Sequence, residues 1–350
     1  MAVEQIMRIV VFGMIGIIFL SPIKRKVNSY YPLEKSSTDR MKGIACIMVI
    51  LGHASYQLDG KGIFSFTTGF AFVALSVFFF VSGYGLMHSL INKENYLAHF
   101  FKKRILLVLL PFWSSNIIFY IYNIIKGERY GILNSIERII GIKLFVGHNW
   151  YVQVIVLFYI IFYLVARFIK KQKNIVIVFL IINIIILFLS QIGIPYIPQN
   201  ACCSSTFFIG ILFAYDKTIM YKVLSIKLVY RIIIALIGLI EYSYIYIIRF
   251  HYADNIVLQK IGEFTIPVLF LVLVIIFVSS YEFGSKVFNI ICICSYEIFL
   301  MHQIAIDIGK AACTYSSIAL VIIFILIIPI GGILYYWNAI LKRLIQRITK

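Results

Sequence analysis

The sequence contains few charged residues, and acidic residues are the scarcest of them. Only 13% of the 350 residues are Asp, Glu, Lys or Arg, and 14 are acidic. A soluble domain of this size carries about a quarter charged residues. This chain therefore lacks the polar side chains that would cover a surface in water, which excludes a soluble globular protein.

The sequence also lacks the patterns that are typical of several other classes of protein. The sequence shows no alternation of polar and apolar residues over about ten positions, which is typical of outer-membrane barrels. Its six cysteines have no metal-ligand spacing, so the sequence predicts no metal site. We find no linker, low-complexity run or persuasive repeat, and we expect the chemistry to occur within a helix bundle or at its two mouths.

Long apolar runs are what the sequence has instead, with 62% hydrophobic residues and a mean hydropathy of +0.98. A helix needs about 20 residues to cross the hydrocarbon core of a membrane. We predict an all-α, polytopic transmembrane bundle with eleven spans, near residues 6–23, 41–58, 64–91, 104–125, 150–168, 174–192, 205–216, 229–248, 264–281, 287–309 and 316–337. Because a basic cluster follows the first run instead of preceding it, we expect a retained helix and not a signal peptide.

The basic residues predict the orientation of these spans. The formal net charge is +18, and 23 of the 32 Lys and Arg fall on one side if the amino terminus is outside. Cytoplasmic loops concentrate Lys and Arg, so we expect the amino terminus outside and the carboxyl terminus inside. The positive charge then indicates topology and attraction for anionic lipid or an anionic cofactor, not nucleic acid.

Lys42 and His53 are two ionisable residues within the second run (MKGIACIMVILGHAS, residues 41–55). At about 100° per residue they share one stripe of a helix, about 16 Å apart along its axis. They could line a path from a cytoplasmic anion to a reaction centre deep in the membrane. Alternatively, Lys42 is an interfacial anchor and His53 bonds a neighbouring helix.

Three adjacent cations, Lys102, Lys103 and Arg104, precede the fourth run. Such a cluster usually reflects topology, but it also suits the phosphates of a nucleotide-containing cofactor such as coenzyme A. In the third run (FFFVSGYGL), Gly83 and Gly85 favour close helix packing, and Ser82 could donate a hydrogen bond into the interior.

Three further polar or aromatic residues are candidates for the site. Trp150 begins the fifth run, where a membrane-interface aromatic is the simpler interpretation and stacking on a sugar ring is the other. In SYEIFLMHQ, Glu297 points about 140° away from His302, so the two need not form a pair. Interhelical bonding explains Glu297 adequately, whereas His302 is equally consistent with packing and with acid/base chemistry.

Five of these segments, in order, resemble the acyltransferase-3 family of membrane O-acyltransferases that modify bacterial surface polysaccharides. That family has a basic residue, usually Arg, followed by Gly and a later His, and SSTDRMKGIACIMVILGH matches with Lys42, Gly43 and His53. The other segments are FFFVSGYGL, KKRILLVLLPFW, HNWYVQVIVLFY and SYEIFLMH. The resemblance implies an acyltransferase domain at residues 38–337, after an extra helix and cytoplasmic linker (1–37) and before a basic tail (338–350). Lys42 lacks the planar fork of the usual Arg.

The resemblance implies an enzyme of the bacterial cytoplasmic membrane that moves an acetyl group from acetyl-CoA to a glycan hydroxyl, with no permanently bound cofactor. We expect catalytic roles for His53 as base or nucleophile, for Lys42 and for His302. Donor binding is expected of Lys42, Lys102, Lys103 and Arg104, and substrate binding of Ser82, Trp150 and Glu297. The alternatives are a flippase for a lipid-linked saccharide and an acyltransferase with a succinyl or longer donor.

Overall fold

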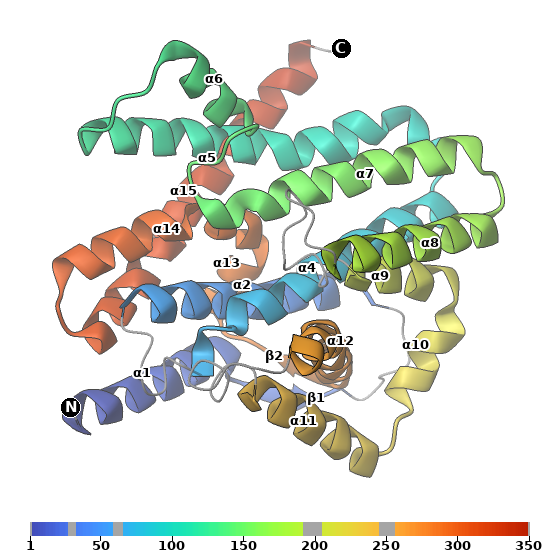
Figure 1. The fold of residues 1–350 in the computed structure, drawn as a ribbon, viewed down its shortest axis with the longest axis horizontal. Helices are drawn as coiled ribbons and strands as arrows, with labels where there is room; N and C mark the ends of the chain where they lie inside the picture. The colour runs from blue at the N-terminus through green and yellow to red at the C-terminus, as the bar shows by residue number, and fades with distance from the viewer. Residues whose placement is uncertain (1, 27–32, 59–65, 192–204, 245–255, 349–350) are drawn as a thin grey trace.

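The computed structural model describes residues 2–26, 33–58, 66–191, 205–244 and 256–348, and 86% of these residues are helical (Figure 1). The α-helices are α1 (Ala2–Leu20), α2 (Lys35–Leu58), α4 (Phe70–Asn92), α5 (Leu106–Ile125), α6 (Ile132–Ile140), α7 (Trp150–Phe168), α8 (Gln172–Gln191), α9 (Ser205–Tyr215), α10 (Lys217–Leu224), α11 (Leu228–Ser243), α12 (Ile256–Ser280), α13 (Lys286–Ile293), α14 (Ser295–Ala312) and α15 (Ser316–Ile348). Three short turns of other helix types are η1 (Tyr96–His99), η2 (Phe101–Ile105) and η3 (Gly147–Asn149). The predicted all-α class is confirmed.

Seven helices in the described part of the chain are long and apolar enough to cross a membrane. The number is up to nine if each of two bent helix pairs counts as one span. These helices make the chain a multi-pass membrane protein. In the part that the structure describes, the eleven apolar runs of the sequence are almost entirely helical.

The run at 287–309 is not one helix, contrary to expectation. It divides into α13 and α14, which meet at an angle of 96°. The break lies at Cys294, whose backbone leaves the helical region (φ −96°, ψ 13°). Hydropathy cannot reveal this break because the residues on both sides of it are apolar.

One further helix and a pair of strands fall mainly where the sequence predicts loops. Helix α10 lies within the segment 216–231, where Asp216 caps it by accepting a hydrogen bond from the backbone of Thr218. Strands β1 (Ile23–Arg25) and β2 (Tyr281–Phe283) form an antiparallel pair. This pairing joins the segment after α1 to the segment after α12, so it depends on tertiary structure that local patterns do not encode.

Helix α2 is the centre of the bundle. It packs against α4, α12, α13, α14 and α15. Its buried residues occupy every side of the helix, as expected for a helix enclosed by others. The side chains of α2 are therefore positioned by rigid neighbours.

Helices α4 and α9 approach each other most closely at two glycines. A Cβ on Gly83 would lie 2.1 Å from the carbonyl oxygen of Phe207, and one on Gly210 would lie 2.2 Å from that of Phe80. The packing role predicted for Gly83 is confirmed. The same role for Gly85 is wrong, because no atom of another segment lies within 4 Å of its Cβ position.

Helix α1, the extra helix, is joined to α15 by a buried polar cluster. Arg8 is only 4% exposed and donates to the Ser316 hydroxyl from Nη2 at 2.7 Å. The carboxylate of Glu4 accepts hydrogen bonds from the Ser316 hydroxyl (2.8 Å) and the Ser317 backbone N–H (2.9 Å). Helix α1 is thus part of the folded bundle.

We expect Arg8→Ala to destabilise the protein. The change removes charge-assisted hydrogen bonds and leaves buried partners unpaired, which costs about 2 kcal/mol. The thermal midpoint in detergent should fall by several degrees. The matched control is Arg129→Ala, at an exposed position in the loop after α5, which should leave the midpoint unchanged. Equal midpoints for both variants would contradict a stabilising role for the cluster.

Candidate active site

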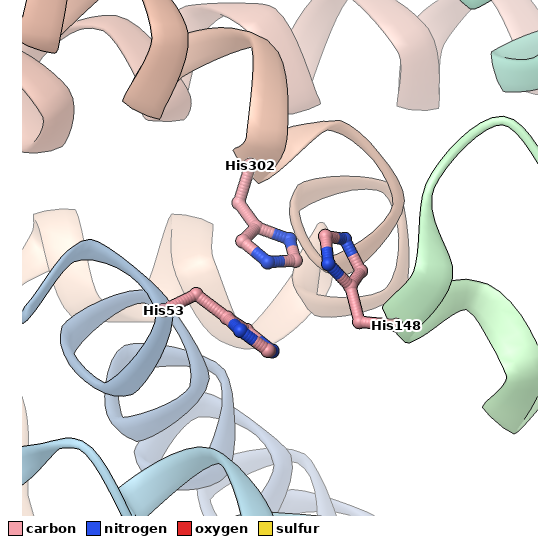
Figure 2. A group of neighbouring side chains, drawn as sticks. All are labelled: His53, His148 and His302. Atoms are coloured by element: carbon pink, nitrogen blue, oxygen red, sulfur yellow. The ribbon is translucent and has the colours of Figure 1, made fainter. Parts of the chain in front are cut away.

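Three histidines from distant parts of the sequence meet in the interior. His53 comes from the last turns of α2, His148 from η3, and His302 from the middle of α14 (Figure 2). One ring nitrogen from each lies within 4.8 Å of those of the other two. The ring centroids of His148 and His302 are 4.2 Å apart, and His53 lies 4.6 and 5.1 Å from them. We refer to these three residues as the histidine cluster.

One hydrogen bond fixes the tautomer of His302. Its Nδ1 lies 2.6 Å from the backbone carbonyl oxygen of Phe299. Because a carbonyl oxygen only accepts, Nδ1 carries the proton, and the neutral ring has its lone pair on Nε2. Nε2 of His302 and Nε2 of His148 are buried and have no hydrogen-bond partner among the described residues. Unpaired polar atoms of this kind are rare in protein interiors and often mark functional sites.

Close helix contacts place His53 within the cluster. A Cβ on Gly52 would lie 2.6 Å from the backbone nitrogen of Ala71 in α4, so only glycine permits this approach. One turn beyond His53, the side-chain amides of Gln57 and Gln303 exchange two hydrogen bonds of 2.8 and 2.9 Å. These contacts hold α2 against α4 and α14 on both sides of His53.

A cavity of about 320 Å³ adjoins the cluster. Its volume is at the lower end of the range for small-molecule sites. His53, His148 and Trp150 line it, together with Val49, Gly52, Tyr56, Thr68, Gly69, Ala71, Phe72, Leu75 and Phe299. The structure therefore brings the predicted residues His53 and Trp150 to one cavity, and His302 lies directly behind them.

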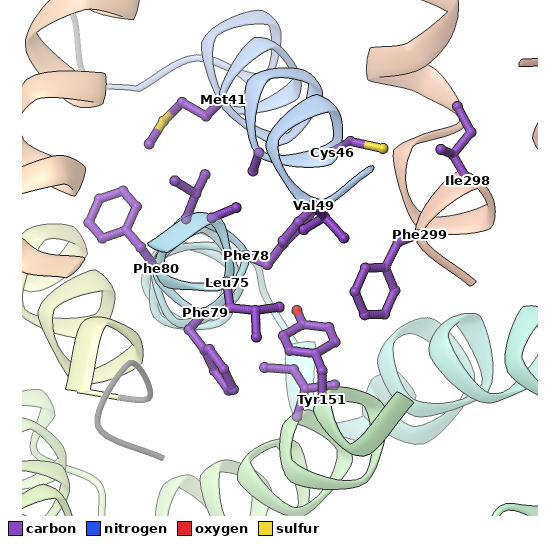
Figure 3. Packing of buried hydrophobic residues seen from close by; sticks show 14 of the residues in the cluster. Met41, Cys46, Val49, Leu75, Phe78, Phe79, Phe80, Tyr151, Ile298 and Phe299 are labelled. Carbon is purple, nitrogen blue, oxygen red and sulfur yellow. The ribbon is translucent and has the colours of Figure 1, made fainter. Parts of the chain in front are cut away.

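Lys42 lies at the other end of α2. Its ammonium pairs with the Asp39 carboxylate at 2.7 Å, and both side chains remain partly exposed. Between Lys42 and His53, the same stripe carries Cys46 and Val49, which are buried in the core (Figure 3). Val49 also borders the cavity at the histidines, so the cavity extends part of the way toward Lys42. Packed side chains around Cys46 fill the remaining distance.

The three cations before α5 have different environments. Lys103 and Arg104 line a second cavity of about 300 Å³, and Lys102 does not. The Arg104 guanidinium donates to the Tyr96 hydroxyl (2.8 Å), the Ser89 hydroxyl (2.6 Å) and the Gly85 carbonyl (3.2 Å). Arg104 therefore ties η2 to η1 and α4, a structural task that the sequence does not indicate. Lys42 does not line this cavity.

Tyr96 is suited to accept the hydrogen bond from Arg104. Burial raises the pKa of the Tyr96 phenol above its usual value, although the neighbouring Arg104 charge acts in the opposite direction. The phenol is therefore neutral at physiological pH, and its oxygen accepts from the guanidinium.

Ser82 and Glu297 do not line the cavity at the histidines. The Ser82 side chain hydrogen-bonds the Tyr159 hydroxyl. Glu297 is 4% exposed, and the charges of Lys42 and Lys342 act on its carboxyl group. Neither residue belongs to the histidine cluster, and their role in substrate binding stays a prediction.

His148 is the site residue that sequence reasoning missed. From the sequence, Trp150 is interpreted as an interfacial aromatic, and His148 has no assigned role. The available signal was a histidine directly before a predicted span in one of the five motifs. The proximity of His148 to the site depends on the tertiary contact between η3 and α14.

We expect Arg104→Ala to lower stability, because it leaves the Tyr96 and Ser89 hydroxyls and the Gly85 carbonyl without their common donor. The loss should amount to about 2 kcal/mol, typical of hydrogen bonds to a charged group, and it is measured as a lower thermal midpoint. Lys103→Ala is the control, since Lys103 is exposed and lines the same cavity. If Arg104→Ala unfolds at the same temperature as Lys103→Ala, the assignment is wrong.

The comparison with known families agrees with the motifs. The family model of the acyltransferase-3 proteins, described as an acyltransferase domain, matches residues 36–337. No curated protein and no solved structure matches the chain. Since the matched region covers most of the sequence, the chain belongs to the acyltransferase-3 family and is a membrane acyltransferase.

Proposed function

We propose that the protein moves an acetyl group from cytoplasmic acetyl-CoA to a hydroxyl of a cell-surface or exported glycan, within the bacterial cytoplasmic membrane. The observation that carries this proposal is the cavity in which His53 and His148 meet Trp150, with His302 behind them. Imidazoles can activate a hydroxyl, and the Trp150 ring offers an apolar face to a sugar.

The proposed reaction needs an activated acceptor hydroxyl and a leaving group, which is the thiolate of coenzyme A. The acceptor O–H loses its proton at the histidine cluster, and its oxygen attacks the carbonyl carbon of the thioester. The bond between that carbon and the sulfur breaks, and the coenzyme A thiolate leaves and takes up a proton. His53 is the member of the cluster that we assign to activation of the hydroxyl, because it borders the cavity and shares one stripe of α2 with Lys42.

The positive charge of Lys42 supports placing acetyl-CoA at the end of α2 that lies away from the histidine cluster. Lys42 lies at the predicted cytoplasmic mouth, where an ammonium attracts the phosphates of coenzyme A. In the proposed topology of eleven spans, the amino terminus is outside, and the histidine cluster lies toward the outer leaflet. The pantetheine arm would extend along α2 toward Val49, and the packed side chains around Cys46 must then move aside.

A flippase is the competing interpretation from another class, and it would use discontinuous helices. The bent pairs α10–α11 and α13–α14 have that form. The family match favours the transferase. Donor identity is decided by comparing acetyl-CoA with succinyl-CoA in the assays below, and a flippase should respond to neither.

His53→Ala should reduce glycan O-acetylation at least about a hundredfold, because activation by a positioned side chain contributes roughly that much. O-acetyl esters on the surface glycan are measured by NMR or mass spectrometry, in cells that lack the gene and express each variant. His88→Ala is the control, since His88 lies near the far end of α4 and outside the cluster. Undiminished acetylation by a folded, inserted His53→Ala protein would remove His53 from the mechanism.

Lys42→Ala should raise the KM for acetyl-CoA about tenfold and leave kcat nearly unchanged, because a charged hydrogen bond contributes about 1.5 kcal/mol or more. Lys42→Arg should restore most of the affinity. The control is Lys35→Ala, at an exposed position in the first turn of the same helix. Stabilisation by acetyl-CoA in thermal unfolding provides a second measurement of donor binding.

Replacement of Asp39 should change the affinity for acetyl-CoA in the opposite direction to replacement of Lys42. Its carboxylate holds the Lys42 ammonium at 2.7 Å and competes with a phosphate for that charge. Asp39→Asn should therefore lower the KM for acetyl-CoA. An unchanged KM in both Lys42→Ala and Asp39→Asn would show that the donor phosphates bind elsewhere.

A further inference from the structure

We propose that His53, His148 and His302 together bind a divalent transition-metal ion, and that Zn²⁺ fits the site best. The three side chains point toward one another from α2, η3 and α14 (Figure 2). Three imidazoles with one open position form a ligand set typical of catalytic zinc.

The distances are close to those of a bound ion. Zinc–nitrogen bonds of about 2.0–2.1 Å in a tetrahedron place the nitrogens about 3.3 Å apart. Here the candidate ligand atoms lie within 4.8 Å of one another. Rotation of the imidazole rings about their side-chain torsions would bring the nitrogens closer to an ion between them.

The hydrogen bond of His302 has the form expected of a metal ligand. Ligating histidines usually donate their other ring N–H to a carbonyl or carboxylate, which fixes the tautomer and the orientation of the ring. His302 donates from Nδ1 to the Phe299 carbonyl at 2.6 Å, so the lone pair of Nε2 is available to an ion.

The cluster is not explained by hydrogen bonds between its own rings. Nε2 of His148 and Nε2 of His302 are both buried without a hydrogen-bond partner among the described residues. The rings of His148 and His302 are tilted by 33° to each other, with centroids 4.2 Å apart, and no N–H···N bond joins them. A cation would satisfy the unpaired nitrogens together.

Ligand chemistry narrows the choice of ion. The cluster contains three imidazoles and no carboxylate or thiolate. Imidazole suits zinc, copper, iron and nickel, whereas magnesium and calcium prefer oxygen. Three neutral ligands leave the ion with its full double positive charge, which favours an anion in the open position.

This inference rests on the proposed function and specifies how the hydroxyl is activated there. The acceptor oxygen would occupy the open position, where the ion lowers the pKa of its proton. The resulting alkoxide attacks the thioester carbonyl carbon, the carbon–sulfur bond breaks, and the proton passes to the departing thiolate. His53 then acts as a ligand, so its replacement removes activity by removing the ion.

Metal content of the purified protein tests the proposal directly. The protein is purified in detergent through an affinity tag without histidine, dialysed against Zn²⁺ and then against metal-free buffer, and analysed by inductively coupled plasma mass spectrometry. We expect about one zinc ion per wild-type chain. His148→Ala, His302→Gln and His53→Ala should each lose most of it, and His88→Ala should retain it.

A second measurement separates metal loss from misfolding. Zn²⁺ should raise the thermal midpoint of chelator-treated wild type and of His88→Ala, but not that of His148→Ala, whose residue lies at the cavity and is only partly buried. Replacement of zinc by Co²⁺ should give the intense visible absorption of a tetrahedral site in wild type and in His88→Ala, but not in His148→Ala. Absence of stoichiometric metal in wild type, or its retention in His148→Ala, would overturn the proposal.

The outcomes also distinguish this inference from the proposed function. Full acyl transfer by a protein shown to be free of metal would refute activation by the ion and leave the transferase function intact. Stoichiometric zinc in a protein that transfers no acyl group would support the metal site and refute the proposed reaction.

Discussion

The tight packing of α2 against α4 and α14 is the constraint on which the site depends. Inside a bilayer, backbone and side-chain polar groups find partners within the protein, because lipid offers none. Gly52 lets the backbones of α2 and α4 touch, and Gln57 pairs with Gln303 across α2 and α14. These contacts enclose His53 on both sides. These contacts therefore hold His53 in the position where it meets His148 and His302.

The same packing divides α2 into two ends with different chemistry. One end carries imidazoles and an aromatic cavity, and the other carries the partly exposed Lys42. Cys46, fully buried and hydrogen-bonded to the Ser295 carbonyl, lies between them. A membrane enzyme that takes its donor from one side must stay sealed to water and ions. Under the proposed function, the packed segment around Cys46 would meet that requirement, and an acyl group would pass it only after the helices shift.

Hydropathy was sufficient for most of the helical fold. In the described part of the chain the predicted apolar runs are almost entirely helical, because long apolar stretches leave the backbone no other way to satisfy its hydrogen bonds in lipid. The break at Cys294, helix α10 and the β1–β2 pair were not predictable. Each of these features depends on the segments that pack against it. The composition of the local sequence does not indicate which segments these are.

The sequence by itself determined that the chain is a helical membrane protein, and that Lys42 and His53 share one stripe, since the helical period fixes this. It also determined the motifs that identify the family. Only the tertiary structure decided that His148 and His302 join His53, that Arg104 is engaged by α4 and η1, and that buried side chains fill the stripe at Cys46. The physical reason is the range of the interactions. A helix repeats its geometry locally, whereas a site built from three distant segments exists only after they pack.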